Sequence, residues 1–169
     1  MPRPGEPLAA FPFEALRRTP DIEAPGLVAV DAADRLILDE SASARADAAA
    51  GEIVVIGDAY GALALGAAWD LAARDRRGTG RVRVHQDALM GERAIAANAA
   101  GLGLADVVAP SPALDAALVT GARVVLMRLP RSLDALRDIA GLIAERAAPD
   151  VAVFAGGRIK HMTRAMNEV

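Results

Sequence analysis

The stretch that decides the fold is GEIVVIGDAYGALALGAA, residues Gly51 to Ala68. Its unbroken apolar run, Ile53 to Ile56, is typical of a strand buried on both faces of a parallel sheet. A turn from Gly57 to Gly61 follows, and small apolar residues then recur at the spacing of a helix that packs on a sheet. A strand, a glycine turn and a helix in this order predict the first unit of a Rossmann-type fold.

The turn Gly57-Asp58-Ala59-Tyr60-Gly61 permits two interpretations. The outer glycines let a nucleotide approach, and the N-terminus of the next helix offers free N–H groups to an anion. Ala59 replaces the middle glycine of a nucleotide-binding turn. The residues therefore predict either a nucleotide site or a purely structural turn, and both remain open.

Strand-like and helix-like segments alternate through the rest of the chain. Strands are expected over 52–57, 82–85, 105–109, 123–129 and 151–155, and helices over 11–18, 27–39, 62–74, 88–100, 131–147 and 158–169. This alternation predicts an α/β fold with a doubly wound, mostly parallel sheet of about five strands, right-handed crossovers and helices on both faces. A ligand is expected beyond the carboxyl ends of the strands.

Residues 1–26 are expected to form an arm and a connector, and residues 27–169 one Rossmann-like domain. The first strand is expected at the centre of the sheet. Its four residues, Ile53 to Ile56, should be nearly fully buried, and so should Val125 and Val153.

Composition excludes several classes of function. The chain has 169 residues, a net charge of −3 and only 3% aromatic residues, so platforms for stacking unpaired bases are scarce. It has no cysteine, which excludes disulfides, thiolate metal sites and cysteine nucleophiles. Its two histidines make no metal motif, and no apolar run reaches ~18 residues. We therefore expect a cytoplasmic protein with no metal and no membrane partner.

Asp87 follows the second strand and has two interpretations. Its carboxylate could accept hydrogen bonds from ribose hydroxyls, or it could cap the helix that begins at Ala88. Gly57, Asp58, Gly61 and Asp87 are accordingly the candidate cofactor-binding residues.

Basic residues form two groups. The turn from Arg74 to Arg83 is either a solvated loop or a phosphate-contacting patch. The second group follows the later strands and comprises Arg128, Arg131, Arg158, Lys160 and Arg164. We expect it at the carboxyl edge of the sheet, in contact with RNA phosphates, with the Arg74 turn at the opposite edge. Arg128 and Arg131 could equally be solvated.

Five segments carry a resemblance to a known family: LVAVDAADRLILDE, VVIGDAYGALALGAA, HQDALMGERAIAANAAGLGL, VVLMRLPRSLDALRDIAGLI and VAVFAGGRIKHMT. In order and spacing, the chain from Leu27 onward resembles the N-terminal half of the two-domain bacterial ribosomal RNA guanine-N2 methyltransferases. That domain looks like a decayed copy of an S-adenosylmethionine methyltransferase domain.

The resemblance implies vestigial cofactor positions. Gly57 and Gly61 match the outer glycines of the first methyltransferase motif, and Asp87 matches the ribose-binding acid. Val55 replaces the usual acid of the first strand. Arg128-Leu129-Pro130 stands where an active domain has Asn-Pro-Pro followed by an aromatic, the motif that grips the target amino group.

The resemblance further implies that this chain is part of a longer protein whose C-terminal domain transfers the methyl group. The chain would then be non-catalytic, would bind no cofactor itself, and would assist ribosomal RNA recognition and fold stability. The alternative is a self-sufficient S-adenosylmethionine-binding methyltransferase that uses Gly57, Gly61 and Asp87. A dehydrogenase fits the glycine turn and the acid spacing poorly.

Overall fold

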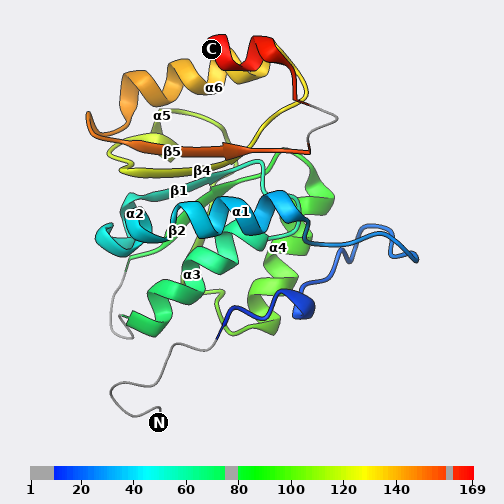
Figure 1. The fold of residues 1–169 in the computed structure, drawn as a ribbon. Helices are drawn as coiled ribbons and strands as arrows, with labels where there is room; N and C mark the ends of the chain where they lie inside the picture. Colours follow the sequence, from blue (N-terminus) through cyan, green and yellow to red (C-terminus); the bar gives the residue numbers. More distant parts are fainter. Residues whose placement is uncertain (1–9, 75–79, 159–161) are drawn as a thin grey trace.

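The computed structural model describes residues 10–74, 80–158 and 162–169. One sheet organises them, in the strand order β3-β2-β1-β4-β5 with every neighbouring pair parallel (Figure 1). The strands are β1 (Ile53–Ile56), β2 (Val82–His85), β3 (Val108–Pro110), β4 (Val124–Arg128) and β5 (Ala152–Gly156). This order reverses direction at β1, as in a doubly wound sheet, and confirms the predicted fold class.

Helices cover both faces of the sheet (Figure 1). One face carries α1 (Ala32–Glu40), α2 (Ala42–Asp47), α3 (Ala62–Arg74) and α4 (Leu89–Gly101), and the other carries α5 (Ala116–Val119) and α6 (Leu133–Arg146). Short 3₁₀ segments complete the described chain: η1 (Phe13–Ala15), η2 (Ala50–Glu52) and η4 (Arg164–Glu168). Ser132 caps α6, because its Oγ accepts the Ala135 N–H at 3.3 Å.

The centre of the sheet is as apolar as predicted. Ile53, Val54 and Val55 are fully buried, Ile56 is 3% exposed, and Val125 on β4 is fully buried. Successive residues of β1 enter different cores, since Val55 packs with α1 and α3 and Val54 packs with α6. A strand covered on both faces needs an unbroken apolar run, and that run was the first signal in the sequence.

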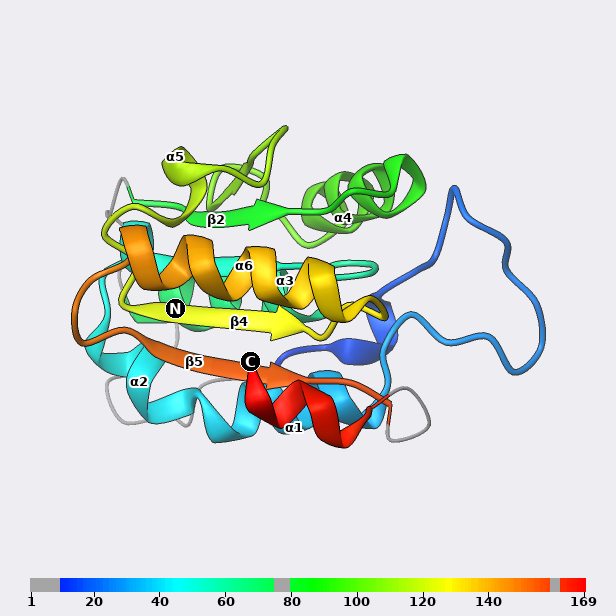
Figure 2. The same cartoon turned by 90° about the horizontal axis from the view of Figure 1, so that it is seen from above.

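The prediction that Val153 is nearly fully buried is wrong, because Val153 is 45% exposed. Its register partner is Val125, so it faces the same side of the sheet as α6. Figure 2 shows the reason: α6 lies over β4, and β5 lies beside it at the edge. Burial therefore alternates along β5 instead of being continuous as in β1.

Several expected boundaries also shift. The helix expected over 27–39 begins only at Ala32, because Asp31 caps it, and its Leu36 is 59% exposed. The helix expected over 11–18 is the short η1. Of the helix expected over 158–169, the described part is the 3₁₀ turn η4. The third strand ends with Pro110, which an edge strand tolerates because a proline lacks only the N–H donor.

The segment ahead of α1 packs against the glycine turn. Asn98 on α4 accepts the Arg17 N–H at 3.0 Å and donates to the Arg17 and Tyr60 carbonyl oxygens, both at 2.8 Å. The Tyr60 hydroxyl donates to Asp21 at 2.6 Å, and the Arg18 guanidinium lies over the Tyr60 ring. Residues 11–21 thus share the core of the domain, although the predicted boundary at residue 26 stays a prediction.

Candidate functional site at the carboxyl edge

Asp58 occupies the N-terminus of α3. Its fully buried carboxylate accepts the backbone N–H groups of Gly61, Leu63 and Ala64 at 2.8 to 2.9 Å. Burial raises the pKa of this carboxyl, against the pull of those hydrogen bonds. The donors that a helix N-terminus offers to an anion are therefore already used by a side chain of the same turn.

The two glycines of the turn have a structural reason to be there. Gly57 and Gly61 have φ angles of +74° and +100°, which residues with a Cβ rarely adopt. A Cβ at Gly61 would lie 2.8 Å from the Leu65 side chain. The geometry of the turn thus accounts for both glycines without a ligand.

The space between the turn and α4 is filled by Gln86. Its amide donates to the Asp58 carbonyl oxygen and accepts the Ala88 N–H at 2.9 Å. Asp87 points outward, with its side chain 91% exposed, and its Oδ1 lies 2.9 Å from His85 Nε2. Asp87 is not the cap of α4, because that helix begins after Ala88, which makes no side-chain cap. That interpretation of Asp87 is wrong, and its ribose-binding role stays a prediction.

A cluster of three charged side chains lies at the carboxyl ends of β1 and β4, and we call it the floor: Asp31, Asp34 and Arg128. Arg128 ends β4, and its Nη1 donates to both carboxylates at 2.7 Å while Nη2 reaches Asp31 at 2.9 Å. Asp31 and Asp34 also form a reciprocal capping box at the start of α1. The floor therefore ties β4 to α1.

The two carboxyls of the floor differ in their titration. The hydrogen bonds from Arg128 hold the pKa of Asp31 far below its usual range. Burial raises the pKa of Asp34 to about 6, because this side chain lies deeper and its residue is only 7% exposed. Hydrogen bonding from the Asp31 N–H and the charge of Arg128 oppose that rise without cancelling it.

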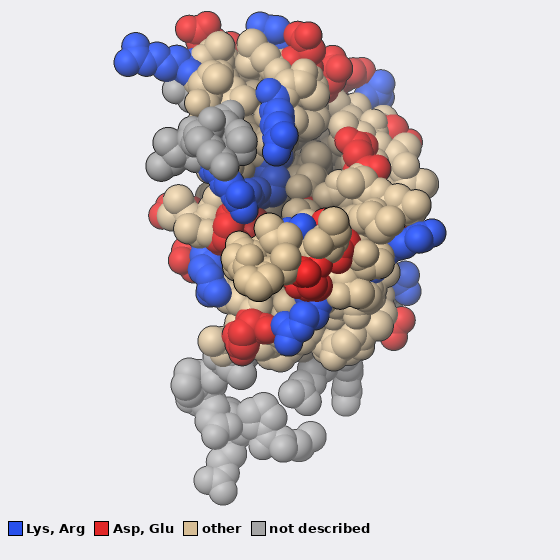
Figure 3. Space-filling view, turned by 90° about the vertical axis from the view of Figure 1, so that its right-hand side faces the viewer, with Lys and Arg blue, Asp and Glu red and all other residues tan. Residues whose placement is uncertain are grey.

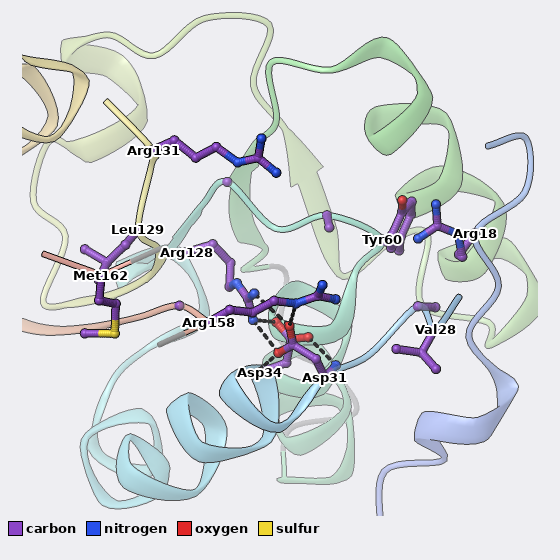
Figure 4. A pocket seen from close by; sticks show the side chains of 14 residues that line it. Arg18, Val28, Asp31, Asp34, Tyr60, Arg128, Leu129, Arg131, Arg158 and Met162 are labelled. Atoms are coloured by element: carbon purple, nitrogen blue, oxygen red, sulfur yellow. Dashed lines mark hydrogen bonds and ion pairs between the residues drawn. The ribbon is translucent and has the colours of Figure 1, made fainter. Parts of the chain in front are cut away.

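Above the floor lies a hollow of about 330 Å³ that opens to solvent. Three further arginines line it, and we call two of them the mouth: Arg131, from the loop after β4, and Arg158, which follows β5. The third, Arg18, is paired with Asp21 at 3.1 Å. Arg158 Nε donates to Asp31 at 3.1 Å. Figure 4 shows both mouth side chains pointing into the hollow, and Figure 3 shows basic side chains gathered around it.

The structure thus brings together three of the five predicted RNA-binding residues, Arg128, Arg131 and Arg158. Arg164 is exposed on η4 and is not among the residues that line the hollow. Lys160 lies outside the described residues. Of the four cofactor candidates, Gly57 lines the hollow, and Asp58, Gly61 and Asp87 do not. Cofactor and RNA binding by these residues stay predictions.

The basic turn after α3 begins at the opposite edge. Arg74 ends α3 and donates to the carbonyl oxygens of Ala46 and Arg45, at the end of α2. Arg81 is exposed just before β2. Arg76 and Arg77 lie outside the described residues. In a parallel sheet the helix ends before the next strand begins, so Arg74 and Arg81 mark the amino edge.

Sequence reasoning missed the two acids of the floor. The signal was present, because Asp31 and Asp34 stand three residues apart just before an apolar helix, which is the spacing of a capping box. That pattern predicts a helix start and says nothing of an arginine 97 residues away. Because the sequence gives no partner for Arg128, this residue was expected to be available to RNA or solvent. In the structure its guanidinium is shared by two carboxylates.

The described residues hold no cluster of His, Cys, Asp or Glu that could bind a metal ion. Among the same residues, no helix is long and apolar enough to cross a membrane.

Comparisons with known proteins agree with the resemblance seen in the sequence. A family model described as the RLMG N-terminal domain matches residues 9–169. Over 165 residues the chain is 33% identical to a protein of Pseudomonas entomophila (strain L48) named ribosomal RNA large subunit methyltransferase G. The match covers 96% of this chain and 41% of that relative, so the chain spans less than half of the relative's length. The chain belongs to the family of RLMG N-terminal domains.

Proposed function

We propose that the chain is the non-catalytic, methyltransferase-like domain of an S-adenosylmethionine-dependent methyltransferase that modifies guanine N2 in large-subunit ribosomal RNA. In this proposal a C-terminal domain of the same cytoplasmic protein binds the cofactor and transfers the methyl group. The present domain contacts the RNA backbone and stabilises the fold of its catalytic neighbour. The relative's name supports the RNA substrate, and the family supports the place of this domain in the protein.

The observation that carries the proposal is that side chains of the chain itself already occupy the polar groups at the carboxyl edge. Asp58 uses the N–H groups of α3, Gln86 fills the space beside the turn, and Arg128 is bound by two acids. The side chain of Asp87, the candidate ribose contact, is accessible. These residues do not fit a bound S-adenosylmethionine, since the cofactor would have to displace internal hydrogen bonds that are costly to break.

Calorimetric titration with S-adenosylmethionine tests the non-catalytic part of the proposal. We expect no saturable heat at micromolar to millimolar cofactor. Micromolar binding that disappears in Asp87→Ala would overturn this part and favour the self-sufficient methyltransferase. A labelled-methyl assay on naked ribosomal RNA should likewise give no turnover, because the residues that position a target amino group are absent at Arg128-Leu129.

The RNA part rests on the charge at the carboxyl edge. The mouth residues are exposed, and Arg131 has no hydrogen bond or ion pair within the described chain. Phosphate contacts from arginines position a protein on RNA without reading its sequence. Because the net charge is −3, binding should be weak and should fall steeply with added salt.

Fluorescence anisotropy with a labelled fragment of large-subunit ribosomal RNA, at 50 and 200 mM salt, tests the RNA part. The double variant Arg131→Glu/Arg158→Glu should weaken binding at least tenfold. Its matched control is Arg81→Glu/Arg123→Glu, which makes the same charge change at two exposed positions of the amino edge. Equal losses from both variants, or no binding at low salt, would leave the domain only a stabilising role.

A further inference from the structure

The hollow above the floor combines two kinds of surface. Its base is polar and already satisfied, since Arg128 bonds both Asp31 and Asp34. Its volume, about 330 Å³, lies at the lower end of the range of small-molecule sites. A ligand that enters it therefore meets the side walls and the mouth rather than an unpaired charge at the base.

The mouth supplies unused hydrogen-bond donors. Arg131 makes no hydrogen bond or ion pair to any described residue, and its side chain points into the hollow (Figure 4). Among the described residues, Arg158 bonds only Asp31, through Nε, and its two terminal nitrogens reach the same space (Figure 4). Arg128, Arg131 and Arg158 face the two carboxylates of the floor, and the fourth lining arginine, Arg18, is paired with Asp21, so one positive charge remains uncompensated. The free donors and the excess charge favour an anion.

One wall of the hollow is apolar. Leu129 and Met162 both line the hollow, toward the same end in the view of Figure 4, and Met162 is 45% exposed. A free inorganic phosphate would leave this wall in contact with water. A nucleotide matches both surfaces, because its phosphate suits arginine donors and its base has a flat apolar face.

We propose, resting on the proposed function, that this hollow receives one unstacked nucleotide of single-stranded RNA. The phosphate is held between Arg131 and the terminal nitrogens of Arg158, and the base lies against Leu129 and Met162. Recognition is of a nucleotide as such, because the floor carboxylates are occupied by arginine and do not read a base edge. Unpaired loops and bulges of RNA offer such nucleotides, whereas duplexes do not.

Methionine-methyl NMR of the full 169-residue chain tests the assignment directly. Uridine or guanosine 5′-monophosphate should shift the Met162 methyl signal saturably, and inorganic phosphate at the same concentration should not. Met90, which is also 45% exposed but lies on α4 outside the residues that line the hollow, is the internal control and should not move. Arg131→Ala/Arg158→Ala should weaken the nucleotide titration at least tenfold, and Arg81→Ala/Arg123→Ala should not change it.

The outcomes separate this inference from the proposed function. An equal Met162 shift with inorganic phosphate would make the hollow a simple anion site and overturn the assignment. The Met162 methyl signal could stay unchanged with nucleotide while the mouth variants still weaken RNA binding. That pair of results would overturn the nucleotide pocket and leave the RNA function intact. Binding of mononucleotides without binding of single-stranded RNA oligonucleotides would also overturn the inference. The ligand of the hollow would then be a free nucleotide. Tighter binding of a single-stranded oligonucleotide than of its duplex supports the inference.

Discussion

The floor and the mouth of the hollow use the same residue type for opposite purposes. Arg128 is held by three hydrogen bonds to Asp31 and Asp34, and its side chain is only 18% exposed. Arg131, three residues later, is exposed and has no partner within the described chain. The difference arises because β4 points Arg128 at the start of α1, whereas Arg131 follows Pro130 into a loop. One arginine stabilises the fold, and the other is available to a ligand.

This comparison also separates two meanings of a cationic site. An arginine that neutralises buried acids cannot be removed without leaving those acids unpaired. An arginine at the mouth can be removed with little effect on the free energy of unfolding. Loss of RNA binding in an Arg128 variant would therefore say little about RNA, and the mouth residues are the informative ones to change.

The largest expected effect comes from Arg128→Met. It removes the cation that bridges Asp31 and Asp34 and leaves the buried Asp34 without an ion-pair partner, so the free energy of unfolding should fall by about 3 kcal/mol or more. Chemical denaturation followed by circular dichroism measures it. Adding Asp31→Asn and Asp34→Asn should restore much of the loss. An Arg128→Met variant as stable as the wild type would show that Arg128 does not stabilise the fold, and that floor and mouth do not differ in this respect.

The next effect concerns pH and Asp34. Since burial raises its folded-state pKa to about 6, from 3.8, the folded state retains this proton over a range in which the unfolded state has lost it. The contribution of Asp34 to the free energy of unfolding therefore declines by up to about 3 kcal/mol as pH rises from about 4 to 6. Above pH 6 this contribution is constant. Asp34→Asn lacks this titration.

Stability curves of wild type and Asp34→Asn between pH 4.5 and 7 provide the measurement. The wild type should lose stability relative to the variant as pH rises. The lowered pKa of Asp31 acts in the opposite direction but only below its ordinary value, so it does not obscure this window. Parallel curves would show that Asp34 is ionised with an ordinary pKa.

Arg158 stands between the two regions and should show an intermediate effect. Its ion pair with Asp31, at 3.1 Å, is half exposed, with 53% of the arginine side chain accessible. Arg158→Gln should lower the free energy of unfolding by less than about 1 kcal/mol, and the loss should shrink in high salt. A double-mutant cycle with Asp31→Asn measures the coupling energy between Arg158 and Asp31. A coupling energy of several kcal/mol would show that Arg158 stabilises the fold as Arg128 does.

The smallest stability effect is expected for Arg131→Gln. Without a partner in the described chain, its removal should change the free energy of unfolding by less than about 0.5 kcal/mol. The same variant should lower the slope of log RNA affinity against log salt concentration by about the amount expected for one phosphate contact. Anisotropy over a salt series measures the slope. An unchanged slope would remove Arg131 from the RNA-binding surface.

Much of the fold was predictable because the relevant signals are local. The apolar run of β1, the glycine turn and the amphipathic α6 each predict their element from neighbouring residues. Val153 escaped such reasoning, because whether a strand lies inside the sheet or at its edge depends on where other helices pack. The same limit applies to residues 11–21, whose contacts with Asn98 and Tyr60 join distant parts of the chain.

The sequence by itself determined the order of elements, the parallel sheet and the family, since spacing and hydrophobic period are carried by the chain locally. It also placed Arg128, Arg131 and Arg158 at the carboxyl edge, because each of them ends or follows a strand. Only the tertiary structure decided which of them are free. Asp31 and Arg128 are 97 residues apart, and their ion pair exists because α1 packs beside β4 and β5. Electrostatic pairing depends on distance in space, and no local pattern records that distance.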